Sequence, residues 1–136
     1  MRIFLAANVL FSAAKSDGAV RRFLTLLIDA GHECCADAYV AEEARRNLSA
    51  KAPEGLEVLE GFLARIHVAV AHPDPGTVDA VLAVPEKDRP VLAAAIRLEC
   101  DALVTGDRTH FGAFYGKRLG GVTIHSPRSL AEVLLR

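Results

Sequence analysis

Short apolar segments alternate with longer amphipathic segments along the chain. Five of the short segments have the length and composition of buried strands: residues 2–5, 32–36, 66–71, 102–105 and 122–125. Strands separated by helices are joined by crossover connections, which favour parallel pairing and place the helices on the faces of the sheet. The sequence therefore predicts an α/β fold of three layers, α/β/α, around a parallel sheet of four or five strands.

The predicted helices show apolar residues at helical spacing and have recognisable ends. In the first of them, Val20, Phe23 and Leu27 share one stripe and Gly31 supplies a stop. The helices are expected at residues 16–30, 39–48, 53–63, 77–84, 88–98 and from 126 to the C-terminus. The turn-rich segment between residues 72 and 76 is too short to be a linker, so 136 residues predict a single domain.

The composition narrows the class of protein. Hydrophobic residues make up 51% of the chain, which predicts a packed core rather than disorder. A formal net charge of −1 excludes a protein that coats nucleic acid by charge alone. There are three cysteines, and the neighbours Cys34 and Cys35 would point to opposite faces of a strand. Such a pattern predicts reduced thiols and a cytoplasmic location.

The N-terminal segment predicts neither secretion nor membrane insertion. It has a basic start and an apolar run to Ala14, but Asn8 interrupts the run and a strand accounts for the same residues. Elsewhere the apolar stretches are shorter than the roughly 20 residues that a membrane span needs. No membrane partner is expected.

Acidic residues stand where a parallel sheet would present them to a ligand. Asp107 follows the strand at 102–105, and Asp88 opens the helix before that strand. Ligands of open parallel sheets bind beyond the carboxyl ends of the strands, so acids at these positions face the functional edge. The first strand ends at the same edge, but Ala6 follows it where an acid would complete the set.

A third carboxylate, Glu43, lies on the helix at 39–48. Hard divalent cations such as Mg²⁺ bind carboxylate oxygens and keep several waters. If Glu43, Asp88 and Asp107 converge, they would repel one another without a cation. The three acids therefore predict a metal site.

Four segments combine these acids with a characteristic set of neighbours: Ile3-Phe-Leu-Ala-Ala-Asn8, Tyr39-Val-Ala-Glu-Glu-Ala-Arg-Arg-Asn-Leu48, Asp88-Arg-Pro-Val-Leu-Ala-Ala-Ala95 and Val104-Thr-Gly-Asp107. Together they resemble the PIN-domain nucleases, including the VapC-type toxins, over nearly the whole chain. The resemblance implies a single PIN-like domain at residues 1–136. It also implies an endoribonuclease that depends on Mg²⁺ or Mn²⁺ and cuts single-stranded or loop RNA, in many bacterial members as a toxin restrained by an antitoxin protein. A homodimer is expected on the same ground.

The resemblance also assigns roles to residues. By position, Glu43, Asp88 and Asp107 would ligate the metal directly or through water, Asn8 would orient the first ligand, and Thr105 would support the site. Asp101 is a weaker candidate. A metal held there would lower the pKa of a bound water and neutralise charge on the phosphate during in-line attack.

Ala6 departs from the family pattern, which has its first aspartate at this position. A methyl group cannot hold a cation, and the loss of one ligand from a small cluster weakens metal binding and misplaces the water. This form is therefore expected to have little activity. Two origins of Ala6 stay open: a deliberate substitution that silences a harmful nuclease, and a naturally degenerate member.

Structural roles compete with these functional ones. Asp88 could only cap its helix, and Asp107 could be an ordinary turn residue. Asp101 could hold Arg97 or begin a strand. Glu42 is expected to face solvent or to pair with Arg46, since neighbours on a helix point about 100° apart.

Several basic residues could form a rim that grips RNA phosphates: Arg45, Arg46, Lys87, Arg89, Arg108, Lys117 and Arg118. Charged residues in such positions are equally often solvated surface. The five histidines lack the spacing of a zinc site, and His67 and His125 are expected to be structural.

Three other functions stay open. The chain could be a catalytically inactive PIN-like module that binds RNA or a protein partner. It could be another α/β hydrolase with Asp88 or Asp107 as nucleophile, although it lacks the Asp-x-Asp opening common in such phosphatases. It could also be an oligomeric scaffold that buries an Ala- and Leu-rich helix face against a second copy.

Overall fold

The computed structural model describes residues 1–72 and 79–134. Its strands are β1 (Arg2–Leu5), β2 (Glu33–Asp37), β3 (His67–Ala69), β4 (Ala102–Val104), β5 (Arg118–Leu119) and β6 (Val122–His125). Its α-helices are α1 (Ala7–Lys15), α2 (Ala19–Asp29), α3 (Ala38–Lys51), α4 (Leu56–Leu63), α5 (Arg89–Arg97), α6 (Arg108–Phe111) and α7 (Pro127–Leu134). Short 3-10 turns occupy Pro53–Gly55, Asp79–Ala83, Glu86–Asp88 and Gly112–Phe114.

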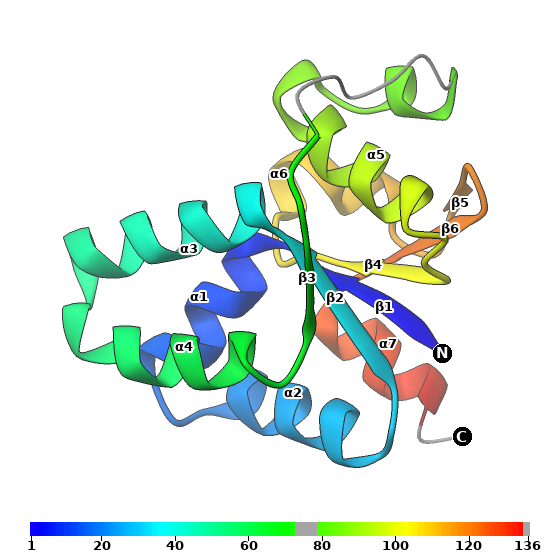
Figure 1. Cartoon of the computed structure of the whole chain (residues 1–136). Helices are drawn as coiled ribbons and strands as arrows, with labels where there is room; N and C mark the ends of the chain where they lie inside the picture. The colour runs from blue at the N-terminus through cyan, green and yellow to red at the C-terminus, as the bar shows by residue number, and fades with distance from the viewer. Residues whose placement is uncertain (73–78, 135–136) are drawn as a thin grey trace.

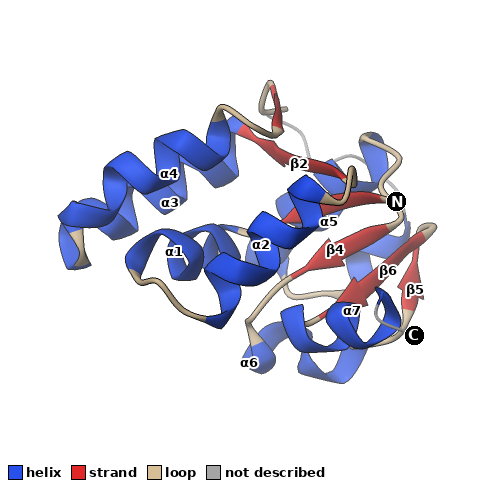
Figure 2. Ribbon diagram, turned by 90° about the horizontal axis from the view of Figure 1, so that it is seen from below, coloured by secondary structure: helices blue, strands red, loops and turns tan. Residues whose placement is uncertain are grey.

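The strands form one sheet in the order β3-β2-β1-β4-β6-β5. Every pair is parallel except β5 with β6, which are antiparallel. Helix α5 covers one face of this sheet, and helices α2 and α7 cover the other (Figures 1 and 2). The molecule therefore has the three predicted layers. The α/β fold is therefore confirmed, and the sheet has one strand more than expected.

The central strands β1 and β4 are almost entirely apolar because both of their faces are covered. In β1, Ile3 is paired with Cys34 of β2 on one side and with Ala102 of β4 on the other, and all three side chains are buried. Such continuous apolar strands are typical of parallel sheets between two helical layers. The strand order reverses at β1, since β2 and β3 lie on one side of it and β4 and β6 on the other.

Two segments differ from the predicted elements near the N-terminus. The chain forms a separate helix, α1, directly after β1, and the next helix begins at Ala19 rather than Ser16, which instead ends α1. Helix α1 is missing from the predicted elements because it directly continues the apolar run of the first strand: Ala7, Val9, Leu10, Ala13 and Ala14 are all buried. It contacts α2, α3 and α4, and its more exposed face carries Asn8, Ser12 and Lys15 at helical spacing.

Other boundaries differ by smaller amounts. Pro53 begins a 3-10 turn, and α4 begins at Leu56. Part of the helix expected at 77–84 lies outside the described residues, and the remainder is a 3-10 turn at Asp79–Ala83. The sequence does not predict the short elements α6 and β5, because stretches of four and two residues show no periodicity.

The three cysteines are free, and all are buried. None of the helices in the described part of the chain has the length and hydropathy needed to cross a bilayer.

Candidate active site

A pocket of about 250 Å³ lies at the carboxyl ends of β1 and β4, where the strand order reverses. This is the position at which open parallel sheets bind their ligands. The predicted site residues Asn8, Glu43, Asp88, Thr105 and Asp107 all line this pocket, together with Ala6. Residues far apart in the sequence, on α1, on α3, before α5 and in the loop after β4, thus meet in one place.

Asp88 and Asp107 lie at the centre of the pocket beside an imidazole. His110 Nδ1 lies 2.7 Å from Asp107 Oδ2 and 3.2 Å from Asp88 Oδ2. These distances are those of ion pairs, while Asp88 Oδ2 and His110 Nδ1 are buried without a hydrogen-bond partner among the described residues. Burial raises the pKa of Asp88, Asp107 raises it further, and His110 acts in the opposite direction.

These three side chains form a cluster with the dimensions of a metal site. One ligand atom from each of Asp88, Asp107 and His110 lies within 4.8 Å of the other two. A buried carboxylate oxygen without a hydrogen-bond donor is costly, and a cation would satisfy it. The donor set therefore fits a divalent cation, with oxygens supplied by the carboxylates and a nitrogen by His110.

His110 is a site residue that the sequence pattern did not predict. Zinc sites are recognised by pairs of histidines at fixed spacing, and His110 has no histidine partner of that kind. The signal that could have found it is its position three residues after Asp107, which places both on one turn of α6. Tyr39 and Asn47 also line the pocket and were not predicted as site residues.

The loop that carries Asp107 is held by α1. Asn8 Nδ2 donates to Thr105 Oγ1 at 3.2 Å, and Asn8 Oδ1 accepts from the backbone N–H of Gly106 at 2.9 Å. Thr105 Oγ1 also accepts from the backbone N–H of Asp107 at 3.1 Å. Asn8 and Thr105 therefore fix the backbone from which the Asp107 carboxylate projects.

The purely structural roles considered for Asp88 and Asp107 can be compared with the hydrogen bonds that these side chains make. The Asp88 side chain makes no capping hydrogen bond to α5, so helix capping does not account for it. Asp107 does cap α6, because its Oδ1 accepts from the backbone N–H of His110 at 3.1 Å. Its second oxygen, Oδ2, faces His110 Nδ1, so capping leaves one carboxylate oxygen in the cluster.

Glu43 lies on the pocket wall formed by α3 and is half-buried, whereas its neighbour Glu42 is exposed. Glu42 pairs with Arg45 at 3.9 Å, so the expected pairing with Arg46 is wrong. Glu43 shares the pocket with Asp88 and Asp107 but is not part of the cluster that they form with His110.

Asp101 lies outside the pocket. Its Oδ2 accepts a hydrogen bond from the backbone N–H of Arg2 at 2.8 Å, before the first residue of β4. This is the opposite end of the strand from Thr105, so Asp101 is not a site residue. It holds the start of β1 rather than Arg97.

The predicted basic rim is dispersed. Lys87 lines the acidic pocket, and Arg108 lines an adjoining cavity. Arg45 forms two hydrogen bonds with Glu60 at 2.8 Å, and Arg118 lines a hollow with Met1 and Asp101. Only part of the expected rim therefore lies near the acids.

Comparison with known proteins agrees with this geometry. The family model described as PIN domain matches residues 2–109. A chain of the crystal structure of VapBC2 from Rickettsia felis, bound to a DNA fragment from their promoter, has the same fold: the TM-score is 0.66 at 17% identity, over 93% of this chain and 98% of that one. Among curated proteins, none matches the chain significantly. With a family match over most of its length and the family's acids gathered in one pocket, the chain belongs to the PIN-domain family.

Proposed function

We propose that this chain is a divalent-metal-dependent endoribonuclease that cuts RNA phosphodiesters and that Ala6 weakens it. The observation that carries the proposal is the convergence of Glu43, Asp88 and Asp107 on one pocket. The PIN-domain family, whose members are generally nucleases, supplies the reaction class.

The cation would be held by Asp88 and Asp107, with Glu43 as an outer ligand. Mg²⁺ and Mn²⁺ both accept carboxylate oxygens, and Mn²⁺ also accepts an imidazole nitrogen such as that of His110. When bound, such a metal activates water at neutral pH and neutralises charge on the phosphate. Asp88 Oδ2 is buried beside His110 Nδ1 without a hydrogen bond, and a cation would satisfy it.

The protein's own residues position the reaction. Asn8 and Thr105 hold the loop so that the Asp107 carboxylate faces Asp88 and His110. Lys87, on the pocket rim, offers a cation to a phosphate oxygen. A difference of 1 Å in the placement of such groups costs about 100-fold in rate, so this support is part of the catalytic design.

Ala6 leaves the pocket one carboxylate short. It is 5% exposed and lines the pocket from the end of β1, so a longer acidic side chain there would point among the other acids. Without that carboxylate the cation has fewer ligands on the β1 side. The result is a weakly bound or misplaced metal and slow cleavage.

The biological setting that we propose is that of a toxin held by an antitoxin protein. The fold is shared with a chain of VapBC2, whose crystal structure holds a DNA fragment from the promoter, and the sequence resembles the VapC-type toxins. We further propose that the chain forms a homodimer and works in the cytoplasm, where its three free thiols stay reduced.

Ala6 also favours a second function. A PIN-like module that has lost its first acid could bind RNA or a protein partner without cutting RNA. The fold and most of the pocket would be retained, because Asn8, Thr105 and Asp107 form a network that does not need residue 6.

The experiment that separates these functions restores the acid. Ala6→Asp is expected to cleave a labelled RNA that has single-stranded loops in Mg²⁺ or Mn²⁺ and to lose that activity in EDTA. The matched control is the double variant Ala6→Asp, Asp107→Asn, which should be inactive. If Ala6→Asp is folded by circular dichroism and cuts nothing with either cation, the binding module is correct and the nuclease proposal is wrong.

A further inference from the structure

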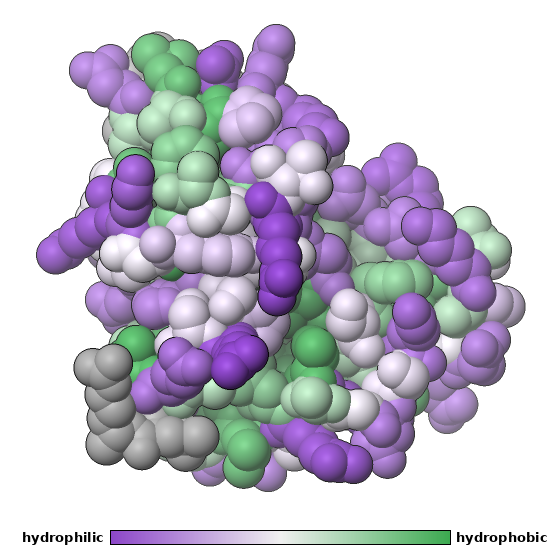
Figure 3. All heavy atoms as spheres, turned by 180° about the vertical axis from the view of Figure 1, so that it is seen from behind, coloured by the Kyte–Doolittle hydropathy of each residue, from purple (hydrophilic) through white to green (hydrophobic). Residues whose placement is uncertain are grey.

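A larger cavity, of about 520 Å³, lies on the other side of the loop that carries Asp107. Its lining residues come from α2, from the loop after β4, from Tyr115 and from the start of α7: Ala19, Val20, Phe23, Gly106, Arg108, Tyr115, Ser126, Pro127, Arg128 and Ala131. Cavities of this size bury most of a small organic ligand. The face that carries the end of α7 shows hydrophobic side chains gathered between hydrophilic ones in its lower half (Figure 3).

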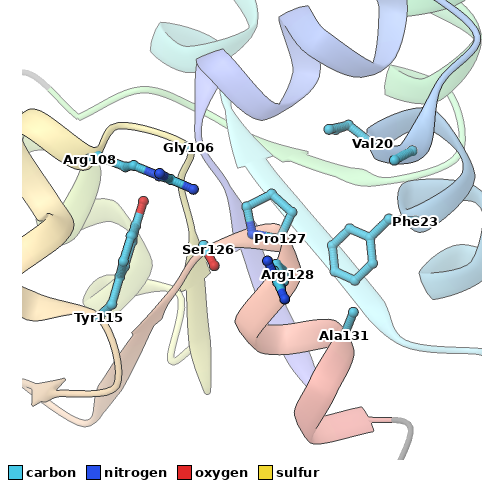
Figure 4. Close-up of a pocket in the computed structure, with 10 residues that line it drawn as sticks. Val20, Phe23, Gly106, Arg108, Tyr115, Ser126, Pro127, Arg128 and Ala131 are labelled. Carbon is cyan, nitrogen blue, oxygen red and sulfur yellow. The ribbon is translucent and has the colours of Figure 1, made fainter.

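The walls of this cavity differ in chemistry. Tyr115 and Arg108 form one side, and Val20 and Phe23 form the opposite side, with Pro127 between them (Figure 4). Tyr115 presents the flat face of its ring toward the cavity, and its hydroxyl donates to the backbone oxygen of Thr105 at 2.9 Å. The ring is therefore a fixed, flat and apolar platform.

Two arginines border this mostly apolar space. Arg108 and Arg128 are both exposed. Arg128 pairs with Glu132 at 3.4 Å, but this ion pair is on the surface and contributes little, so its guanidinium can exchange to another anion. An occupant that complements the cavity therefore has a flat apolar part and negative charges beside it.

The cavity and the acidic pocket lie on the two sides of one short loop. Gly106 and Arg108 line the cavity, while Thr105 and Asp107, which alternate with them in sequence, line the acidic pocket. A single strand that places one phosphodiester at Asp107 and crosses this loop would bring its next unit to the cavity.

We propose that this cavity is a nucleotide subsite, in which a single-stranded RNA places one base against Tyr115 and its flanking phosphates near Arg108 and Arg128. The inference rests on the proposed function, because the acidic pocket has to hold the neighbouring phosphodiester. Stacking on aromatic rings together with basic side chains along the backbone is how single strands are bound without a fixed sequence. An apolar peptide fits less well, since it would offer no anion to Arg108 or Arg128.

The test is the affinity of the intact chain for RNA, measured separately from cleavage. Fluorescence anisotropy of a labelled single-stranded octaribonucleotide in Ca²⁺ gives the Kd, and a gel shows that the RNA is uncut. Arg128→Glu is expected to weaken binding about tenfold or more, with a shallower salt dependence. The control is Arg97→Glu, which makes the same charge change at the exposed end of α5. Its Kd for the RNA is expected to stay within about twofold of the parent value.

A second pair of variants tests the ring. Tyr115→Leu is expected to weaken binding about five- to hundredfold, the range for losing one stacked base, whereas Tyr115→Phe keeps the ring and most of the affinity. Thermal unfolding shows whether each variant is folded. Because Arg128 is exposed, its substitution is a test that does not depend on the fate of Tyr115→Leu.

The outcomes separate this inference from the proposed function. If Arg128→Glu binds RNA as tightly as Arg97→Glu, the subsite proposal is wrong, and the cavity is left for an apolar peptide. If Arg128→Glu loses affinity while Ala6→Asp cuts nothing, the subsite stands as an RNA-binding surface and the nuclease proposal falls. If Ala6→Asp cuts RNA and both cavity variants bind normally, only the subsite is disproved.

Discussion

The side-chain oxygen of Asn8 accepts a hydrogen bond from the backbone N–H of Gly106, which lies 98 positions later in the sequence. The same amide donates to Thr105 Oγ1, so the start of α1 and the loop after β4 are joined at two points. The loop carries Asp107, and its position therefore depends on a side chain that belongs to a different part of the chain.

Asn8→Ala removes both hydrogen bonds and is predicted to weaken divalent-cation binding. Residues that orient metal ligands typically change affinity by about 10- to 100-fold, and a loss in this range is expected for Mn²⁺ by isothermal titration calorimetry. Asn47→Ala removes another amide from the wall of the same pocket and should change the Kd by less than about threefold. Equal effects of the two substitutions would show that Asn8 has no special role in placing Asp107.

Asp88→Asn is predicted to stabilise the metal-free protein and to abolish its response to cations. Burial raises the pKa of Asp88, which shows that its charged form is disfavoured at this position. A neutral amide of the same shape removes that penalty, so the Tm at pH 7.5 in EDTA should rise. Saturating Mn²⁺ should stabilise the parent chain, by about 2.7 kcal/mol at 100 times the Kd, but not the variant. A variant that still responds fully to Mn²⁺ would remove Asp88 from the metal site.

His110→Ala is predicted to reduce selectivity among cations. Imidazole nitrogen suits Mn²⁺ and later transition metals better than Mg²⁺, which prefers oxygen ligands. The Nδ1 atom of His110 lies 2.7 Å from Asp107 Oδ2. Removal of this side chain should therefore weaken the binding of Mn²⁺ by about tenfold and the binding of Mg²⁺ much less. Titration of each cation into the parent chain and into the variant gives the ratio of the Kd for Mg²⁺ to the Kd for Mn²⁺. An unchanged ratio would mean that His110 only contacts the carboxylates and does not ligate the metal.

Much of this site could be predicted because the residues that form it follow elements with clear periodicity. The buried strand β4 locates Thr105 and Asp107, and the apolar stripe of α3 locates Glu43. Parallel strand order then brings their ends to one edge of the sheet. The lack of an acid at position 6 can also be seen in the sequence. Because β1 ends at Leu5, residue 6 lies at the same edge of the sheet.

The remaining features depend on three-dimensional contacts that sequence spacing does not encode. His110 belongs to a helix of four residues, too short to be recognised, and its role emerges only when Asp88 of another element lies beside it. The buried cap Asp37 is also absent from the predicted features, although it accepts from the backbone N–H of Val40 at 2.9 Å at the start of α3. The apolar pattern ends the preceding strand at Ala36, whereas β2 extends one residue further, to Asp37.

Acidification is predicted to destabilise the protein through His125. Burial lowers the pKa of this imidazole below its usual 6.5, and its Nδ1 contacts Ser129 Oγ at 2.9 Å. Between that usual value, which the unfolded chain retains, and the lowered native value, the unfolded chain binds more protons. The free energy of unfolding therefore falls as the pH decreases from about 6.5 through this interval. Urea unfolding between pH 7.5 and 5.0 should show that the free energy of unfolding falls less in His125→Gln than in the parent. If this free energy depends on pH in the same way in both proteins, His125 is not the cause.

Two glycines give opposite predictions for the same substitution. A Cβ on Gly55 would lie 2.7 Å from the backbone oxygen of Ala14 and 3.0 Å from Leu48 Cδ2, in the contact between α1 and the turn before α4. Since a backbone oxygen cannot move aside cheaply, Gly55→Ala should cost about 1–3 kcal/mol in the free energy of unfolding. Gly61 lies within α4, and a Cβ added there would meet no atom within 4 Å, so Gly61→Ala should stabilise by about 0.5–1 kcal/mol through helix propensity. Urea unfolding of both variants measures the difference. A neutral Gly55→Ala would show that α1 is less tightly packed against this turn than the structure indicates.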